Sequence, residues 1–164
     1  MKNIAIGLLM VVLLSVLVEP LVEMGNVLRE KILIGSALSN ACRAAKNRSL
    51  IYEKMRDLDA EIDKEVFKDY FSEAFESAMN ATRSSTSGDT IVFTSNDGKY
   101  NTFKVDLDIT TTKDVYTEQS ITEVRVKAES FYKFKTKYLK LAEEAGGAGY
   151  EITSERMLLL KVEN

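Results

Sequence analysis

The feature that most constrains this chain is an apolar run near its N-terminus that passes, without a turn signal, into a helical pattern. Residues 4–18 are apolar apart from one glycine and one serine, and Leu21 and Val22 extend the run past Glu19 and Pro20. As a helix, residues 4–22 measure about 28 Å at ~1.5 Å per residue, close to the roughly 30 Å of a bilayer core. The sequence therefore predicts an uncleaved membrane-anchor helix over residues 1–24.

Two other interpretations of this run remain open. Lys2 followed by an apolar core also fits the first two regions of a secretory signal peptide, but Val16 and Val18 do not form the small-residue cleavage site that such a peptide needs. A buried core helix is the third interpretation. For an anchor, Lys2 and the amino terminus favour the cytoplasmic side, which leaves the remaining chain extracytoplasmic.

A helical periodicity continues beyond the apolar run. Large or small apolar residues recur three or four positions apart from Met24 to Cys42, falter at residues 47–49, and resume from Ile51 to Ala78. We expect an extracytoplasmic helical segment over residues 25–83, either one bent helix or two helices split near residues 47–57.

Small side chains gather in the first part of this segment, around Gly35, Ala41 and Cys42. Small residues at helical spacing let another element approach closely, in the manner of small-xxx-small helix contacts. Packing beneath the protein's own sheet and packing between subunits are equally compatible with this pattern. Cys42, the only cysteine, is interpreted either as a packed small residue or as the site of an intermolecular crosslink.

The C-terminal half has the period-two alternation of strands. A polar stretch at residues 82–88 is interpreted as a linker, and the domain that follows, residues 84–164, carries four strand patterns. These patterns lie at residues 91–94, 103–110, 123–135 and 150–162, with a glycine-rich connector at 145–149. The fold class is therefore α+β, a long N-terminal helix packed against a small antiparallel sheet of about four strands.

Composition excludes several function classes. The net charge is −3, histidine is absent and there is one cysteine, so the sequence offers no basic field for nucleic acid and no multi-cysteine metal site. The acidic residues between 57 and 65 would split over two faces of a helix and are interpreted as solvated helix surface, and Asp106 with Asp108 as part of a charged sheet face. We therefore expect no enzyme activity, catalytic residue, cofactor, metal, nucleic acid or small-molecule substrate.

Two segments carry a resemblance to a known family. The first is Glu19 and Pro20 within the apolar run, and the second, about twenty residues later, is the stretch ALSNACRAA at residues 37–45. Together with a final apolar strand, MLLLKVEN, they resemble the TadE-like family, the pseudopilin or minor-pilin components of tight-adherence secretion systems. Family members commonly place the glutamate and the proline several residues apart, whereas here they are adjacent.

The resemblance implies a pilin-like structural subunit that resides in the inner membrane before assembly. It would then pack its apolar helices against copies of itself or other pilin-like subunits in an extracellular filament. Glu19 would pair with a neighbour's amino terminus or Lys2, Pro20 would mark a hinge, and sheet residues such as Lys127, Lys133 and Lys135 would face outward. The alternative is a membrane-anchored accessory or sensor protein of a secretion or conjugation system that does not polymerise.

Overall fold

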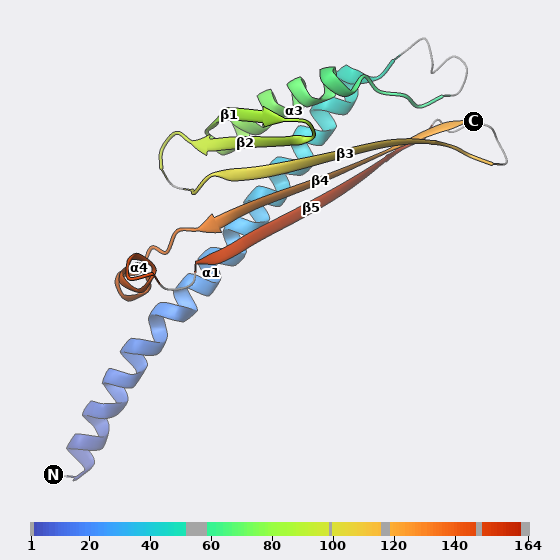
Figure 1. Cartoon of the computed structure of the whole chain (residues 1–164). Helices are drawn as coiled ribbons and strands as arrows, with labels where there is room; N and C mark the ends of the chain where they lie inside the picture. The colour runs from blue at the N-terminus through green and yellow to red at the C-terminus, as the bar shows by residue number, and fades with distance from the viewer. Residues whose placement is uncertain (1, 52–58, 99, 116–118, 147–148, 162–164) are drawn as a thin grey trace.

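In the residues that it describes, the computed structural model of the chain contains one long helix, a second helix folded back against it, a short third helix and one antiparallel sheet (Figure 1). It describes every residue except 1, 52–58, 99, 116–118, 147–148 and 162–164. The helices are α1 (Lys2–Ser49), α3 (Lys64–Met79) and α4 (Lys137–Glu144). The strands, in sheet order, are β1 (Ala81–Ser87), β2 (Thr90–Ser95), β3 (Phe103–Lys113), β4 (Ser120–Tyr132) and β5 (Tyr150–Leu160). The α+β fold class is confirmed, with five strands in place of four.

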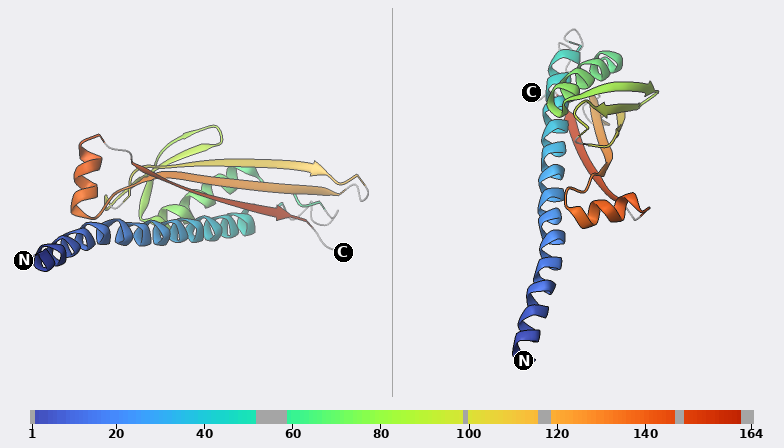
Figure 2. Two further views of the ribbon diagram at one scale, coloured as in Figure 1. Left: turned by 90° about the horizontal axis from the view of Figure 1, so that it is seen from below. Right: turned by 90° about the vertical axis from the view of Figure 1, so that its left-hand side faces the viewer.

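The core lies between the sheet and the two long helices. The C-terminal half of α1 and the whole of α3 cover one face of the sheet, whereas the N-terminal half of α1 extends beyond it (Figures 1 and 2). Phe67, Phe71 and Phe75 stack along α3 with ring centroids 6.3 and 5.8 Å apart. Phe75 also meets Phe93 of β2 at 4.9 Å and Phe103 of β3 at 5.8 Å. Aromatic residues thus join α3 to the sheet.

The two central strands follow the predicted alternation. Val105 and Leu107 of β3 are buried opposite Ala128 and Val126 of β4, facing the helices. The opposite face of the sheet carries charged residues whose signs alternate across the strands, as in the cross-strand pair Asp106 and Lys127. Opposite charges directly across an antiparallel pair favour one register.

The helical half divides near the predicted position. α1 ends at Ser49, and Leu50 forms an antiparallel bridge with Ile62 as the chain reverses direction. Asp63 then begins α3 as its N-cap, because its carboxylate accepts hydrogen bonds from the backbone N–H groups of Glu65 and Val66. The acidic residues of this region therefore do not lie on one helix as expected. Asp59 and Asp63 lie outside helices, and Asp57 lies outside the described residues.

Two more sequence predictions are wrong. The expected polar linker at residues 82–88 forms β1, an edge strand that pairs with β2 although nearly all its side chains are exposed. Backbone pairing, with Gly88 at φ +60° in the turn, places this segment in the sheet without any apolar signal. The strand predicted over residues 123–135 also ends earlier than its lysines suggested, since β4 ends at Tyr132 and α4 occupies part of the connection to β5. Residues 147–148 of the expected connector and Val162 of the expected last strand lie outside the described residues.

Candidate functional site

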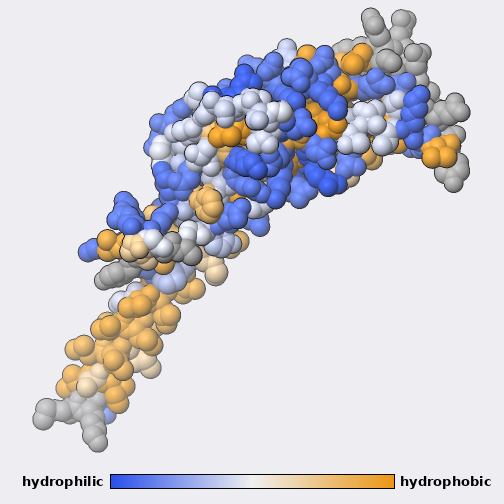
Figure 3. All heavy atoms as spheres, viewed as in Figure 1, coloured by the Kyte–Doolittle hydropathy of each residue, from blue (hydrophilic) through white to orange (hydrophobic). Residues whose placement is uncertain are grey.

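The N-terminal half of α1 is apolar and contacts almost nothing in the chain. The side chains of residues 3–22 are exposed except that of Glu19, which is half-buried. Leu9, for example, is 70% exposed. The space-filling view shows this segment as a continuous hydrophobic rod that leaves a mostly hydrophilic body (Figure 3). Among the residues that the structure describes, one helix is thus long and apolar enough to cross a membrane once.

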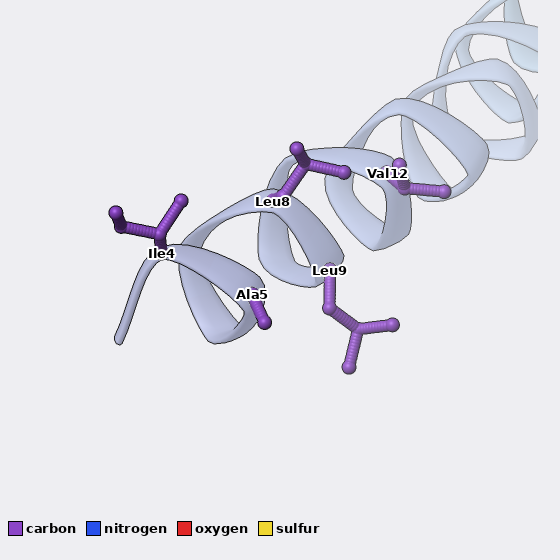
Figure 4. Close-up of a pocket in the computed structure, with 5 residues that line it drawn as sticks. All are labelled: Ile4, Ala5, Leu8, Leu9 and Val12. Atoms are coloured by element: carbon purple, nitrogen blue, oxygen red, sulfur yellow. The ribbon is translucent and has the colours of Figure 1, made fainter. Parts of the chain in front are cut away.

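The first turns of α1 contain no ligand site of their own. Ile4, Ala5, Leu8, Leu9 and Val12 line an apolar hollow on this single helix, and their side chains point outward into open space (Figure 4). A hollow with one helix as its only wall does not enclose a small molecule. It is a surface that lipid or another helix would cover.

Glu19 and Pro20 lie where the free half of α1 meets the rest of the molecule. The helix continues through Pro20 and curves gently in its N-terminal half, so the proline does not end it (Figure 2). Val16, Glu19 and Pro20 form a small hollow with Leu139 of α4. The Lys2 side chain lies outside the described residues. Its α-carbon is about 26 Å from that of Glu19 along one helix at ~1.5 Å per residue, so the predicted pairing requires a second subunit.

Beyond residue 22, α1 has two distinct faces. One face turns to the sheet and carries Glu23, Val27, Glu30 and Ile34, all of which are buried. The opposite face continues the apolar surface from the end of the apolar run, at Leu21, past residue 22 with large exposed residues, here called the outer stripe: Leu21, Met24, Leu28 and Ile32. Their spacing of three, four and four residues aligns them along one side of the helix.

Glu23 is the first residue of α1 that the sheet domain buries. Its side chain is 2% exposed and accepts hydrogen bonds from the Tyr132 hydroxyl at 2.6 Å and from the backbone N–H groups of Lys135 and Thr136 at 2.5 Å each. These donors come from the last residue of β4 and from the two residues that precede α4. A single carboxylate therefore joins α1 to the segment between the sheet and α4.

Glu30 makes a second connection two turns further along the same face. It is also 2% exposed, and it accepts hydrogen bonds from the Tyr100 hydroxyl at 2.5 Å and from the Lys135 ammonium at 2.9 Å. A buried carboxylate needs such partners because an uncompensated charge is costly to remove from water. Lys135 lies beyond the end of β4 and is 44% exposed, and its ammonium group turns back toward α1.

Both tyrosines remain neutral hydrogen-bond donors. Burial, followed by the hydrogen bond to the adjacent carboxylate, raises the pKa of Tyr132 and the pKa of Tyr100 well above the ordinary value of a phenol. Each tyrosine therefore stays protonated and donates a hydrogen bond to its glutamate over the whole physiological pH range.

The small-residue cluster packs within the chain. Ala41 and Cys42 are buried in the core, and Gly35 lies so close to β5 that an added Cβ would meet the Arg156 guanidinium at 2.6 Å and the Ser154 hydroxyl at 3.2 Å. Of the two interpretations of these residues, the structure supports packing beneath the protein's own sheet. Gly35 allows β5 to approach α1 closely.

Cys42 is predicted to be unreactive in the folded protein. Burial raises the pKa of its thiol to about 12, so almost no reactive thiolate is present at neutral pH. Maleimide should label Cys42 in denaturant and not under native conditions, as followed by mass spectrometry. Rapid native labelling would show that α1 separates from the sheet, and an intermolecular disulfide in native material would contradict the buried position.

Sequence reasoning missed the residues that join α1 to the sheet. Glu23 and Glu30 lie seven positions apart on the same face as Val27 and Ile34, so helical periodicity alone places both carboxylates toward the core. Their partners Tyr100 and Tyr132 are distant in sequence and carry no comparable signal. Of the six residues singled out from the sequence, Gly35, Ala41 and Cys42 lie in the core, Glu19 and Pro20 lie beside α4, and Lys2 begins α1.

Within the part of the chain that the structure describes, no three acidic, cysteine or histidine side chains converge on a point where a metal ion would bind. The Asp106 carboxylate accepts a hydrogen bond from the Thr90 hydroxyl and forms an ion pair with the Lys104 ammonium. The backbone N–H of Ser120 donates to Asp59 at 2.7 Å. These carboxylates thus serve the fold.

Comparison of the chain with models of protein families, with curated proteins and with solved structures found no match. The function is therefore argued from the surfaces described above.

Proposed function

We propose that the protein is a membrane-anchored, pilin-like structural subunit that assembles through its N-terminal helices. In this proposal residues 4–22 reside in the membrane before assembly and pack against the same segments of other subunits afterwards. The sheet domain lies outside the membrane and forms the surface of the filament. The resemblance of Glu19, Pro20 and residues 37–45 to the TadE-like family points in the same direction.

The observation that carries this proposal is the outer stripe. A simple anchor needs apolar residues only within the bilayer, and a helix on the surface of a water-soluble domain normally carries polar residues on its free face. Here Leu28 is 56% exposed and Ile32 is 68% exposed, on the face of α1 that the sheet leaves uncovered. The stripe extends the apolar surface roughly 15 Å past residue 22 at ~1.5 Å per residue.

Packing between neighbouring helices gives this stripe a role. If α1 helices align in an assembly, Leu28 and Ile32 become buried, and each fully buried side chain contributes about 1.5–3 kcal/mol. The small residues of the core do not contribute to this contact, because they face the protein's own sheet. Assembly would thus use the apolar span and the outer stripe of α1.

The experiment replaces both exposed residues with carboxylates, as Leu28→Glu together with Ile32→Glu. The variant should fold and reach the membrane, because exposed substitutions usually change stability by less than about 0.5 kcal/mol. Its release as high-mass particles on shearing of the native source cells should be lost, because two charges would be buried in each contact. Negative-stain microscopy and sedimentation of the sheared material measure the loss.

A matched control adds the same two charges at exposed polar positions of α1, as Asn40→Glu with Asn47→Glu. It should assemble like the unmodified protein. If the Leu28 and Ile32 variant also assembles, the outer stripe is not the contact. If the unmodified protein releases no particles, the chain is the non-polymerising anchored accessory protein instead.

A further inference from the structure

The short helix α4 lies beside the apolar N-terminal segment of α1. Leu139 of α4 adjoins Val16, Glu19 and Pro20, residues that fall inside the apolar run of residues 4–22. The views in Figure 2 show α4 running across the direction of α1, at the end of the sheet domain nearest the N-terminal half of α1. A helix that crosses a membrane-spanning helix in this way runs along the membrane surface.

From this placement we infer that α4 is an interfacial helix that lies in the membrane surface and binds lipid headgroups and the adjoining acyl chains. The inference rests on the proposal that α1 spans a membrane. It assigns to α4 a ligand, the bilayer surface, and so predicts a second membrane contact besides α1.

The length of α1 leaves no other position for α4. To hold α4 entirely in water, the membrane segment would have to end before Val16. It would then contain at most residues 4–15, about 18 Å of helix, against the roughly 30 Å that a bilayer core requires. With residues 4–22 in the membrane, Pro20 and Val16 lie about 3 and 9 Å inside the end of the span at ~1.5 Å per residue. Interfacial helices bury their apolar face to a similar depth, about 5–10 Å.

The residues of α4 suit a position at the membrane surface. Leu139 turns toward α1, while Leu141 is 53% exposed and Ala142 is exposed beside it. Lys137 and Lys140 are exposed on the remaining surface together with Glu144, and the long ammonium side chains reach the headgroups. An exposed leucine that follows Lys140 and lies one turn from Lys137, next to a membrane-spanning helix, fits the boundary between acyl chains and headgroups.

Glu23 fixes α4 at this level. It binds the backbone of Lys135 and Thr136, the two residues that immediately precede α4, so the first turn of α4 cannot rise away from the membrane without breaking buried hydrogen bonds. Glu143 of α4 accepts from the backbone N–H of Phe134 as well. The helix is thus held against the base of the sheet domain.

The test measures the depth of single nitroxide labels in the full-length protein. In a Cys42→Ala background, cysteine is introduced in α4 as Leu141→Cys. Three reference variants are made in the same background. Leu9→Cys places a label within the span, Thr110→Cys on the exposed side of β3, and Glu144→Cys on the polar side of α4. The variants are reconstituted in vesicles of phosphatidylcholine with phosphatidylglycerol. Collision rates with oxygen and with a water-soluble nickel complex report the depth of each label.

We expect the Leu9 label in the hydrocarbon and the Leu141 label at the acyl–headgroup boundary. The collision rate of the Leu141 label with the nickel complex should be at least roughly threefold below the rates of the Thr110 and Glu144 labels, given the burial of about 5–10 Å typical of interfacial helices. A Leu141 label as accessible as Thr110, with Leu9 in the hydrocarbon, overturns the inference and leaves the anchor standing. A water-accessible Leu9 label overturns both.

Discussion

Removal of residues 1–22 is expected to convert a membrane-bound protein into a soluble, folded one. None of the side chains described in this segment is buried, whereas Glu23 and the residues after it hold the sheet. Each leucine, isoleucine or valine removed from the centre of a spanning helix takes away about 0.3–0.6 kcal/mol of insertion free energy. The fragment should therefore appear in the supernatant after membranes are sedimented, and it should be monomeric in sedimentation velocity.

A second, longer truncation serves as the control for this experiment. A fragment that lacks residues 1–30 also loses Glu23 and Glu30, and it should be less stable, with weaker near-ultraviolet circular dichroism from the tyrosines. Membrane retention of the first fragment would show that the rest of the protein binds membranes without the apolar segment of α1. High-mass assembly of that fragment would remove the role proposed for the apolar helix.

The second large effect is expected from Glu23→Ala. The substitution leaves the Tyr132 hydroxyl and two backbone N–H groups buried without their acceptor, and each unsatisfied buried group costs about 1–3 kcal/mol. We expect the free energy of unfolding to fall by roughly 3–5 kcal/mol, as is typical when a buried charged network is broken. Urea unfolding of the full chain in detergent, followed by the tyrosine signals, measures this loss.

The loss of stability caused by Glu23→Ala should depend on pH, and the pKa of Glu23 gives the sign of that dependence. Burial pushes the pKa of Glu23 upward, but the hydrogen bonds from Tyr132, Thr136 and Lys135 outweigh it and hold the pKa below the usual 4.5. Because the folded-state pKa is the lower one, the stabilisation is complete above the unfolded value and is lost as the pH falls through the folded value. The difference between Glu23→Ala and the unmodified protein should thus be constant from pH 8 to 6 and shrink below about pH 4.5.

A control for this variant is Glu73→Ala, which removes a carboxylate whose side chain is 73% exposed and should change stability by less than about 0.5 kcal/mol. Equal effects of the two substitutions would show that the junction between α1 and β4 is not held by Glu23. The mechanism would also be wrong if the effect of Glu23→Ala grew as the pH fell.

The helices and central strands were predictable because their patterns repeat over many residues. The apolar run and the three-to-four spacing after it define α1, and period-two alternation defines the inner faces of β3 and β4. β1 was not predictable in this way, since an edge strand of serine and threonine buries little. α4 was missed because eight residues give too few helical repeats to stand out.

The sequence by itself determined the segment that favours lipid, the fold class and the absence of histidine chemistry, because these depend on composition and local period. Only the tertiary structure decided which face of α1 the sheet covers. That choice places Gly35, Ala41 and Cys42 inside the protein and leaves Leu28 and Ile32 outside. It also brings Tyr132 and Tyr100 to Glu23 and Glu30, more than 60 residues away in the chain, because a buried carboxylate must find its donors in three dimensions and no local pattern records them.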